Sequence, residues 1–190
     1  AGAGDNVLDG GAGSDTVSYS GATAAVVASL GDGAGHASGG SGNDTLLRIE
    51  NLVGSNYSDS LTGDSLDNVL NGGLGNDTLT GGSGADTFCF DTLLKALTNR
   101  DTITDFHSSE DLIALENTIF TSLTPGSLAA GAFCSGAGVS SAADADDRVI
   151  YDSSSGALYY DADGLGGRGV MQFASLSGAP ELSYLDFLVT

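Results

Sequence analysis

The chain has 190 residues, with 25 acidic and 5 basic side chains, and its formal net charge is −20. Nearly all of the acidic residues are Asp, which together with Gly favours turns over helices and argues against a mostly helical protein. The negative charge also argues against binding to nucleic acid or anionic lipid, because both need a basic surface, and suggests a positively charged partner. No apolar run approaches the roughly 18 residues of a membrane span, so membrane insertion is not expected.

Residues 1–90 carry a repeated nonapeptide of the form G-G-x-G-x-D-x-U-x, in which U is an apolar residue. Complete copies occupy residues 10–18, 39–47, 72–80 and 81–89. Weaker copies that keep the frame occupy residues 1–9, 54–62 and 63–71. The first and last of these place Asn6 and Asn68 in the acidic position, while the middle copy has Tyr57 in place of a glycine. Residues 19–38 interrupt the pattern with an expected strand followed by glycine-rich turns.

Each nonapeptide divides into a six-residue loop and a three-residue strand. Glycine tolerates left-handed backbone and leaves its carbonyl groups accessible, and the Asp adds a carboxylate. Carbonyl and carboxylate oxygens are the ligands that Ca²⁺ prefers, whereas Mg²⁺ needs a tighter octahedron. The apolar position of each unit is expected to point inward, as in Leu61, Leu70, Leu79 and Phe88. A strand this short buries little, so folding should depend on the bound ion.

The nonapeptide resembles the calcium-binding repeat of RTX proteins. The resemblance implies an all-β fold, a right-handed parallel β-roll in which two nonapeptides make one turn and ions lie between loops two units apart. On that geometry Asp59 would share a row of ions with Asp77, and Asn68 with Asp86. The departures at Asn6, Tyr57 and Asn68 imply weaker or vacant sites.

The composition changes after Cys89. Residues 91–99 are compatible with a short helix capped by Asp91, and residues 101–106 and 110–115 alternate polar and apolar side chains as strands do. A loop-like stretch at 121–147 precedes three strands expected at 148–152, 157–163 and 170–176. We therefore expect a repeat region, residues 1–90, followed by a β-rich cap, residues 91–190.

This second region resembles the C-terminal domain of serralysin-type proteins exported by type I secretion. The resemblance rests on GADTFCFD (84–91), DTITDF (101–106), GALYYDADG (156–164) and the terminal DFLV (186–189). It implies that Asp101 and Asp105 cap the last ion and that the acidic-then-apolar tail is the secretion signal. The residues expected to hold calcium are Gly11, Gly13, Asp15, Gly40, Gly42, Asp44, Asp59, Asn68, Gly72, Gly73, Gly75, Asp77, Gly81, Gly82, Gly84, Asp86, Asp101 and Asp105.

Other motifs favour simpler interpretations. Asp161–Gly164 begins like an EF-hand loop but lacks the later acids, so a hairpin turn is the better reading. Ser65 lies in a lipase-like tetrapeptide inside a repeat, and the G-x-G-x-x-G pattern at 164–169 joins two expected strands instead of a strand and a helix. Cys89 and Cys134 could form a disulfide or remain as two free thiols.

The sequence thus predicts a non-catalytic, calcium-binding module of a larger secreted bacterial protein, whose parent could be a metalloprotease or another hydrolase. The chain would stay unfolded in the cell, pass through the type I secretion machinery and fold on meeting extracellular calcium. The alternative is an adhesin or carbohydrate-binding module that uses the exposed face of the roll to bind an extracellular polysaccharide or cell surface.

Overall fold

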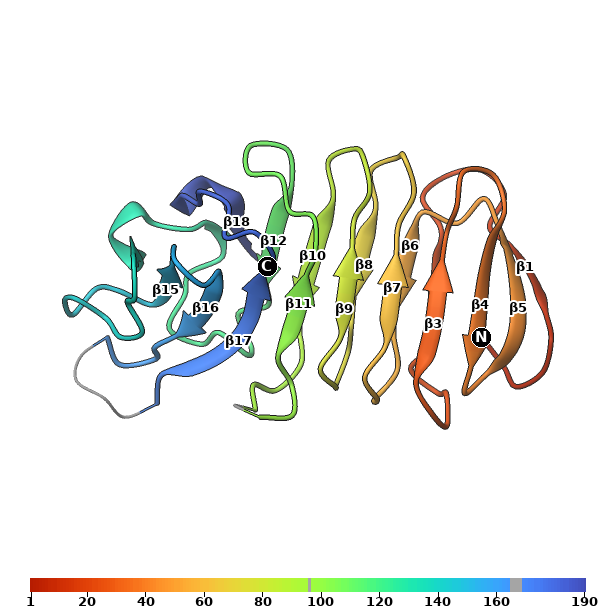
Figure 1. Ribbon diagram of the computed structural model, residues 1–190, viewed down its shortest axis with the longest axis horizontal. Helices are drawn as coiled ribbons and strands as arrows, with labels where there is room; N and C mark the ends of the chain where they lie inside the picture. Colours follow the sequence, from red (N-terminus) through yellow and green to blue (C-terminus); the bar gives the residue numbers. More distant parts are fainter. Residues whose placement is uncertain (96, 165–168) are drawn as a thin grey trace.

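A computed structural model describes residues 1–95, 97–164 and 169–190. Within them the strands form two sheets that face each other along the molecule (Figure 1). The long sheet contains, in spatial order, β1 (Val7–Asp9), β5 (Gly42–Leu47), β4 (Gly35–Gly39), β3 (Val26–Ser29), β7 (Ser60–Thr62), β9 (Thr78–Thr80), β11 (Asp101–Ile103), β17 (Met171–Leu176), β16 (Ala157–Tyr160), β15 (Val149–Asp152) and β14 (Phe133–Gly136). The short sheet contains β13 (Gly126–Ser127), β18 (Phe187–Val189), β12 (Leu112–Leu115), β10 (Thr87–Phe90), β8 (Val69–Asn71), β6 (Asn51–Val53) and β2 (Thr16–Ser18).

The central part of the molecule is a parallel β-roll, as predicted. The chain alternates between the sheets, so that β7, β9 and β11 are parallel neighbours in one and β8, β10 and β12 in the other. Ser60 pairs with Thr78 and Val69 pairs with Thr87. Both pairs are 18 residues apart, which confirms that two nonapeptides make one turn.

The core of the roll is a single file of apolar side chains between the two sheets. Leu61, Leu70, Leu79 and Phe88, the expected inward positions, are all fully buried. The file continues beyond the last full repeat through Ile103 of β11 and Ile113 of β12, which are also 0% exposed. The two sheets therefore run without interruption past residue 90, where the repeat motif ends.

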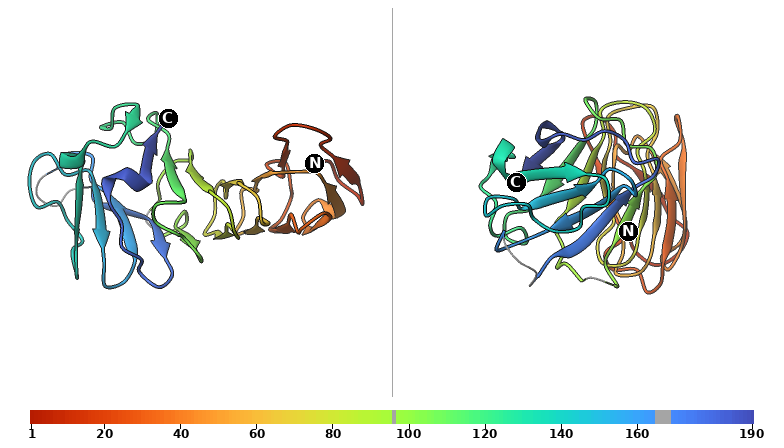
Figure 2. Two further views of the ribbon diagram at one scale, coloured as in Figure 1. Left: turned by 90° about the horizontal axis from the view of Figure 1, so that it is seen from above. Right: turned by 60° about the vertical axis from the view of Figure 1, so that its left-hand side comes forward.

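The sheets lie closest together over the central repeats and are farther apart toward the C-terminal end (Figure 2). The change follows the size of the core side chains, because phenylalanines replace leucines there. Phe90 contacts Phe173 at a centroid distance of 5.1 Å, and Phe120 contacts the same ring at 5.2 Å. Such edge-to-face aromatic pairs fill a wider space than one leucine per strand can fill.

An antiparallel insertion interrupts the roll near its N-terminal end. β4 pairs antiparallel with both β3 and β5, and the Gly31–Gly33 turn has the left-handed backbone expected of that glycine-rich stretch. The repeat predicted at 39–47 is consequently altered, because Gly39 ends β4 and pairs with Gly42 across the β4–β5 hairpin turn instead of opening a free loop. A side chain at Gly40 would collide with the backbone of Ala24. Only the second half of this unit, from Gly42, keeps the geometry of a repeat.

The C-terminal region forms the expected strands. β15, β16 and β17 are antiparallel neighbours, and β17 returns to the roll by pairing parallel to β11. The predicted helix over 91–99 is wrong: the described residues there form bends and a bridge between Lys95 and Asn99, with Ala96 outside them. Asn99 instead accepts a hydrogen bond from the Gly75 backbone, at 2.8 Å, which holds this loop against the repeats.

Two short 3₁₀ helices, Ala130–Ala132 (η1) and Tyr184–Asp186 (η2), complete the described chain, and neither is long or apolar enough to cross a membrane. The possible disulfide is not formed. Cys89 lies on β10 of the short sheet and Cys134 on β14 at the edge of the long sheet, and both are free thiols. The glycine-rich pattern at 164–169 falls mostly on residues 165–168, outside the described residues.

Candidate metal-binding loops

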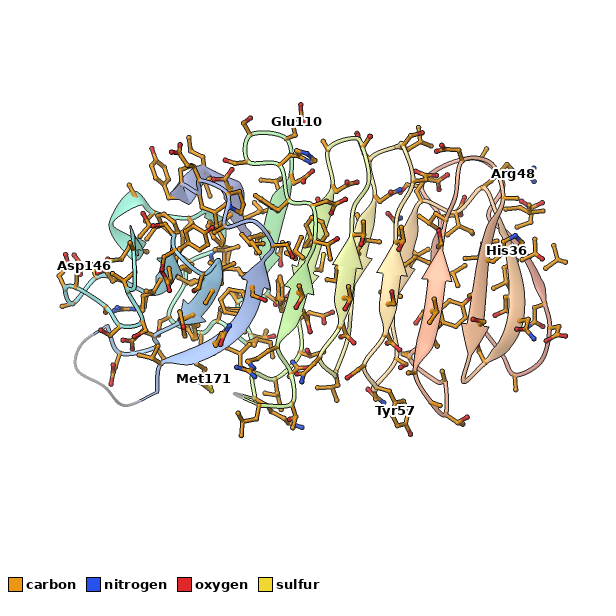
Figure 3. All side chains as sticks on the ribbon, in the orientation of Figure 1. His36, Arg48, Tyr57, Glu110, Asp146 and Met171 are labelled. Carbon is orange, nitrogen blue, oxygen red and sulfur yellow. The ribbon has the colours of Figure 1, made fainter. Side chains whose placement is uncertain are left out.

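The loops of the roll gather at its two opposite edges, marked in Figure 3 by Tyr57 on one side and Glu110 on the other. Each loop ends in a polar residue directly before a strand, and these residues form two rows. The first, which we call the Asp59 row, consists of Asp59, Asp77 and Asp101. The second, the Asn68 row, consists of Glu50, Asn68, Asp86 and Asp111.

A ladder of hydrogen bonds connects the members of the Asp59 row. The backbone N–H of Asp59 donates to Oδ1 of Asp77 at 2.7 Å, and the N–H of Asp77 donates to Oδ1 of Asp101 at 3.1 Å. Asp59, the first member of the row, accepts through Oδ1 from the backbone N–H of Val26 at 2.7 Å. Each carboxylate is therefore held over the preceding turn, and the sharing of ions between Asp59 and Asp77 stays a prediction.

Asp77 is the least satisfied member of this row. It is 1% exposed, and its Oδ2 atom is buried without a hydrogen-bond partner. Burial, with the charge of Asp59 adding to it, raises the pKa of Asp77 to about 7. Burial and the charge of Asp77 raise the pKa of Asp101 to about 8. A buried carboxylate with an unused oxygen costs free energy unless a proton or a cation neutralises it.

The Asn68 row repeats the ladder at the opposite edge. The N–H of Asn68 donates to Oδ1 of Asp86, and the N–H of Asp86 donates to Oδ1 of Asp111, both at 2.9 Å. Burial is the main cause that raises the pKa of Asp86 to about 6, and the charge of Asp111 contributes. At the start of the row, Glu50 Oε2 accepts from the N–H of Asp15 at 2.8 Å.

Glycines let the loops of one row stack closely. A Cβ atom added at Gly72 or Gly81 would collide with the carboxylate of its own loop, Asp77 or Asp86. A Cβ at the next glycine positions would collide with a backbone carbonyl of the preceding loop. These positions are Gly73, Gly75, Gly82 and Gly84, which face the carbonyls of Ser55, Tyr57, Asp64 and Leu66. The predicted glycines thus bring carboxylate and carbonyl oxygens together at each edge.

Asp105 joins the Asn68 row from outside the repeats. Its Oδ1 atom accepts from the N–H of Gly81 and its Oδ2 atom from the N–H of Gly82, both at 2.9 Å. Its charge is one of the causes that raise the pKa of Asp86. The two acids of DTITDF therefore serve different edges, Asp101 ending the Asp59 row and Asp105 lying beside Asp86.

The predicted residues of the first two full repeats differ in how closely they are packed, and Asp44, at 2% exposed, is the more buried acid. Asp44 keeps the ladder geometry, because its Oδ1 atom accepts from the N–H of Asn6 at 2.9 Å. Gly42 packs on the carbonyl of Gly4, as the corresponding glycines of the regular loops do. Asp15 has a buried Oδ2 atom without a partner. The glycines of its own loop, Gly11 and Gly13, have open space around them.

Asparagine in the acidic position places N–H donors among the oxygen atoms of the loops. The Nδ2 atom of Asn68 donates to the carbonyl of Glu50 at 3.0 Å. That of Asn6 donates to the carbonyl of Gly4 at 2.7 Å and to Oδ1 of Asp44 at 2.8 Å. An amide supplies donors where a carboxylate supplies only acceptors. Weaker or vacant sites at the two asparagines stay a prediction.

Glu50 and Asp111 were missed by the sequence prediction. Glu50 could have been found, because positions 50, 59, 68, 77 and 86 follow one another at intervals of nine residues and Leu52 occupies the inward position. Asp111 lies 25 residues after Asp86, and its place in the row depends on the length of the loop before it. The sequence gives no period that would indicate it.

The donor atoms that suit a calcium ion in these loops are mostly backbone carbonyl oxygens. Among the described residues, no three His, Cys, Asp or Glu side chains converge on one point. A site of one or two carboxylates with several carbonyls is nonetheless a normal donor set for Ca²⁺, which takes six to eight oxygens. The unpartnered oxygen of Asp77 and the glycine-lined carbonyls around it meet that requirement.

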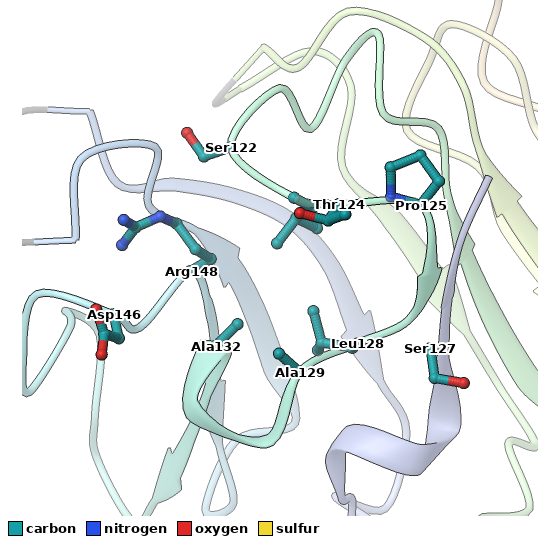
Figure 4. Close-up of a pocket in the computed structure, with 10 residues that line it drawn as sticks. Ser122, Thr124, Pro125, Ser127, Leu128, Ala129, Ala132, Asp146 and Arg148 are labelled. Carbon is teal, nitrogen blue, oxygen red and sulfur yellow. The ribbon is translucent and has the colours of Figure 1, made fainter.

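The cap contains a hollow of about 380 Å³ lined by residues including Ser122, Pro125, Leu128 and Arg148 (Figure 4). The Arg148 guanidinium donates to the backbone carbonyls of residues 145 and 147, at 2.9 and 2.7 Å. Ser122 donates its hydroxyl to the carbonyl of Ala162 at 2.7 Å. These polar groups therefore hold loops together, and we assign no chemistry to the hollow.

A family model described as the peptidase M10 serralysin C terminal matches residues 5–124. No curated protein matches the chain. Among solved structures, the solution structure of the AlgE6R3 subunit from the Azotobacter vinelandii mannuronan C5-epimerase is 23% identical. The match covers 99% of this chain and 80% of that one, with a TM-score of 0.42.

Proposed function

Because the chain belongs to the serralysin C-terminal family of M10 peptidases, with a parallel β-roll and two rows of stacked loops, we propose that it is a calcium-binding module of a secreted bacterial protein. Calcium would bind at both edges of the roll, and binding would drive folding. The module itself carries out no reaction in this proposal, and any catalytic activity would belong to other parts of the parent protein.

The observation that carries the proposal is the environment of Asp77. Its carboxylate is buried between two loops, its Oδ2 atom has no donor, and its pKa is raised to about 7. The neighbouring members of the row, Asp59 and Asp101, are acids too and bring no positive charge to it. A divalent cation between the loops would neutralise the row and bind the exposed carbonyls at the same time.

The residues that would hold calcium are the carboxylates of the two rows and the carbonyls facing the glycines. In the regular part these are Asp59, Asp77 and Asp101 at one edge and Asp86, Asp105 and Asp111 at the other. The ion supplies positive charge that allows like-charged loops to stack. Since the ligands come together only in the folded chain, the binding energy contributes directly to folding.

This coupling suits export as an unfolded chain. With little calcium the net charge of −20 and the mutual repulsion of the rows would keep the chain extended and soluble. Extracellular calcium would then fold it after passage through the type I secretion machinery. The C-terminal region would cover the end of the roll, whose strand edges would otherwise be open to aggregation.

Calcium titration of the chain, followed by far-ultraviolet circular dichroism and isothermal calorimetry, tests the proposal. We expect a cooperative folding transition between about 0.1 and 10 mM Ca²⁺, the range of extracellular calcium modules, that EDTA reverses. Mg²⁺ at the same concentrations should fold the chain poorly. A chain that is equally folded in EDTA, or that shows no transition in this range, would refute calcium-driven folding.

A second candidate function is binding of an uncharged extracellular polysaccharide, and the outer face of the long sheet favours it. One outward row of hydroxyl side chains crosses three strands and consists of Ser60, Thr78 and Thr102. A second row beside it contains Thr80 and Thr104, whose hydroxyl oxygens lie 2.7 Å apart. These positions present hydroxyl side chains in an otherwise acidic protein. Binding to neutral glycans that is lost when Thr78 and Thr102 become Asp would establish it.

A further inference from the structure

The C-terminal tail is folded into the roll. β18 pairs parallel to β12 in the short sheet, and Phe187 and Val189 are 1% and 2% exposed. The acidic residue before them, Asp186, is 3% exposed although it lies only four residues from the chain end. The DFLV segment expected to act as the secretion signal is therefore buried in the folded chain.

Asp186 spans two segments that are far apart in sequence. Its Oδ2 atom accepts from the N–H of Ser183 at 2.7 Å, which closes a capping box at the start of η2. Its Oδ1 atom accepts from the hydroxyl of Ser108 at 2.8 Å and from the N–H of Ser109 at 3.1 Å. One carboxylate thus connects the tail to the loop between β11 and β12.

That loop is strained at the point where Asp186 contacts it. Ser109 has a φ of 76°, a left-handed conformation that costs a non-glycine residue free energy. Such a conformation persists only where neighbouring contacts hold it. Asp186 supplies two of these contacts, one to Ser109 itself and one to the preceding residue.

The same loop carries the last acid of the Asn68 row. Asp111 accepts from the N–H of Asp86 through Oδ1 and from the N–H of His107 through Oδ2, the latter at 2.7 Å. The conformation of residues 107–111 therefore decides whether Asp111 lies over Asp86. Any contact that holds Ser109 in place also positions this carboxylate.

We propose that Asp186 is a positioning residue for the last calcium-binding loop, so that burial of the C-terminal tail and completion of the Asn68 row are one event. The proposal rests on the calcium-binding function proposed above. It means that the tail is available to the secretion machinery only while the last loop is disordered. Folding outside the cell buries the tail, so the secretion machinery cannot bind the tail of a folded chain.

Hydrogen exchange measured by mass spectrometry at increasing calcium concentration tests this in the full chain. In the unmodified protein, peptides covering residues 107–111 and 183–190 should gain protection at the same calcium midpoint. In Asp186→Ala, both peptides should need roughly three- to tenfold more calcium, the effect of losing hydrogen bonds to a charged acceptor. The central repeats, residues 54–80, should keep their original midpoint.

Two further variants separate positioning from general destabilisation. Glu181→Gln removes one exposed negative charge from the same tail and should change nothing. Adding Ser109→Gly to Asp186→Ala should restore much of the calcium midpoint of residues 107–111, because glycine adopts φ of 76° without strain. A residue that acted only on the tail would not be rescued by a change in this loop.

The outcomes distinguish the inference from the function on which it rests. If calcium folds the chain but the tail is protected equally in EDTA, or if Asp186→Ala leaves the midpoint of residues 107–111 unchanged, the positioning role is wrong and the calcium module stands. If calcium folds no part of the chain, the proposed function itself fails.

Discussion

Asp77 and Asn68 occupy the same position in their nonapeptides, yet their side chains are satisfied in different ways. Asp77 has a buried oxygen with no donor. Asn68 accepts from the N–H of Asp64 at 2.7 Å and donates to the carbonyl of Glu50 at 3.0 Å. Both residues supply a hydrogen-bond acceptor at this position, and under the proposed function an ion would be needed only where that acceptor is a carboxylate.

The two rows should therefore respond differently to calcium. An amide carries both an acceptor and donors, so the Asn side chain can donate hydrogen bonds to nearby carbonyl oxygens. A loop that ends in Asp has a carboxylate beside its carbonyl oxygens, and a cation could bind both kinds of oxygen. Within one roll the Asp59 row should depend most on the ion, and the loop of Asn68 should depend on it least.

The largest expected effect comes from Asp77→Ala. The substitution removes the central carboxylate of the Asp59 row, and the calcium midpoint for folding should rise on the order of tenfold as ion contacts are lost. Far-ultraviolet circular dichroism during calcium titration measures it. The same substitution at Asp146, an exposed acid far along the chain from both rows, is the control. An equal shift in both variants would show that net charge and not the row governs folding.

The converse substitution, Asn68→Asp, sharpens the comparison. It replaces the amide that donates to the Glu50 carbonyl with a second carboxylate close to Asp64. We expect calorimetry to count one additional calcium ion per chain, and we expect the calcium-free chain to become less folded. An unchanged ion count would contradict the view that the amide takes the place of an ion.

Protons should partly replace calcium in the Asp59 row. The pKa values of Asp77 and Asp101 are raised from 3.8 to about 7 and about 8 in the folded chain. The folded state therefore binds more protons than the unfolded state between about pH 4 and 8, and lowering the pH through this window favours folding. Circular dichroism in EDTA should show more β structure at pH 5 than at pH 8. Asp77→Asn should weaken this dependence.

Much of this architecture could be predicted because the period of nine fixes both register and side-chain direction. Leu61, Leu70 and Leu79 lie where the repeat places them, and so do the carboxylates of Asp59 and Asp77. The antiparallel insertion at β4 could not be predicted, because its short Gly, Ala and Ser stretch has no apolar period. The residues that finish the rows, Asp101 and Asp111, follow the preceding row members by 24 and 25 residues instead of 18, and no local pattern encodes these separations.

The smallest expected effect compares two serines, one in a loop of each row. Ser55 is 1% exposed and donates its hydroxyl to Oδ1 of Asp59 at 2.8 Å, so it helps to hold the first carboxylate of its row. Ser65 is exposed, and its backbone N–H donates to Oδ1 of Asp32 at 3.2 Å. Ser55→Ala should raise the calcium midpoint by about two- to fivefold, the effect of one hydrogen bond to a charged group, while Ser65→Ala should leave it unchanged. Equal calcium titration curves for the two variants would mean that hydrogen bonds to the Asp59 carboxylate do not limit folding, and that the ion alone holds the row in place.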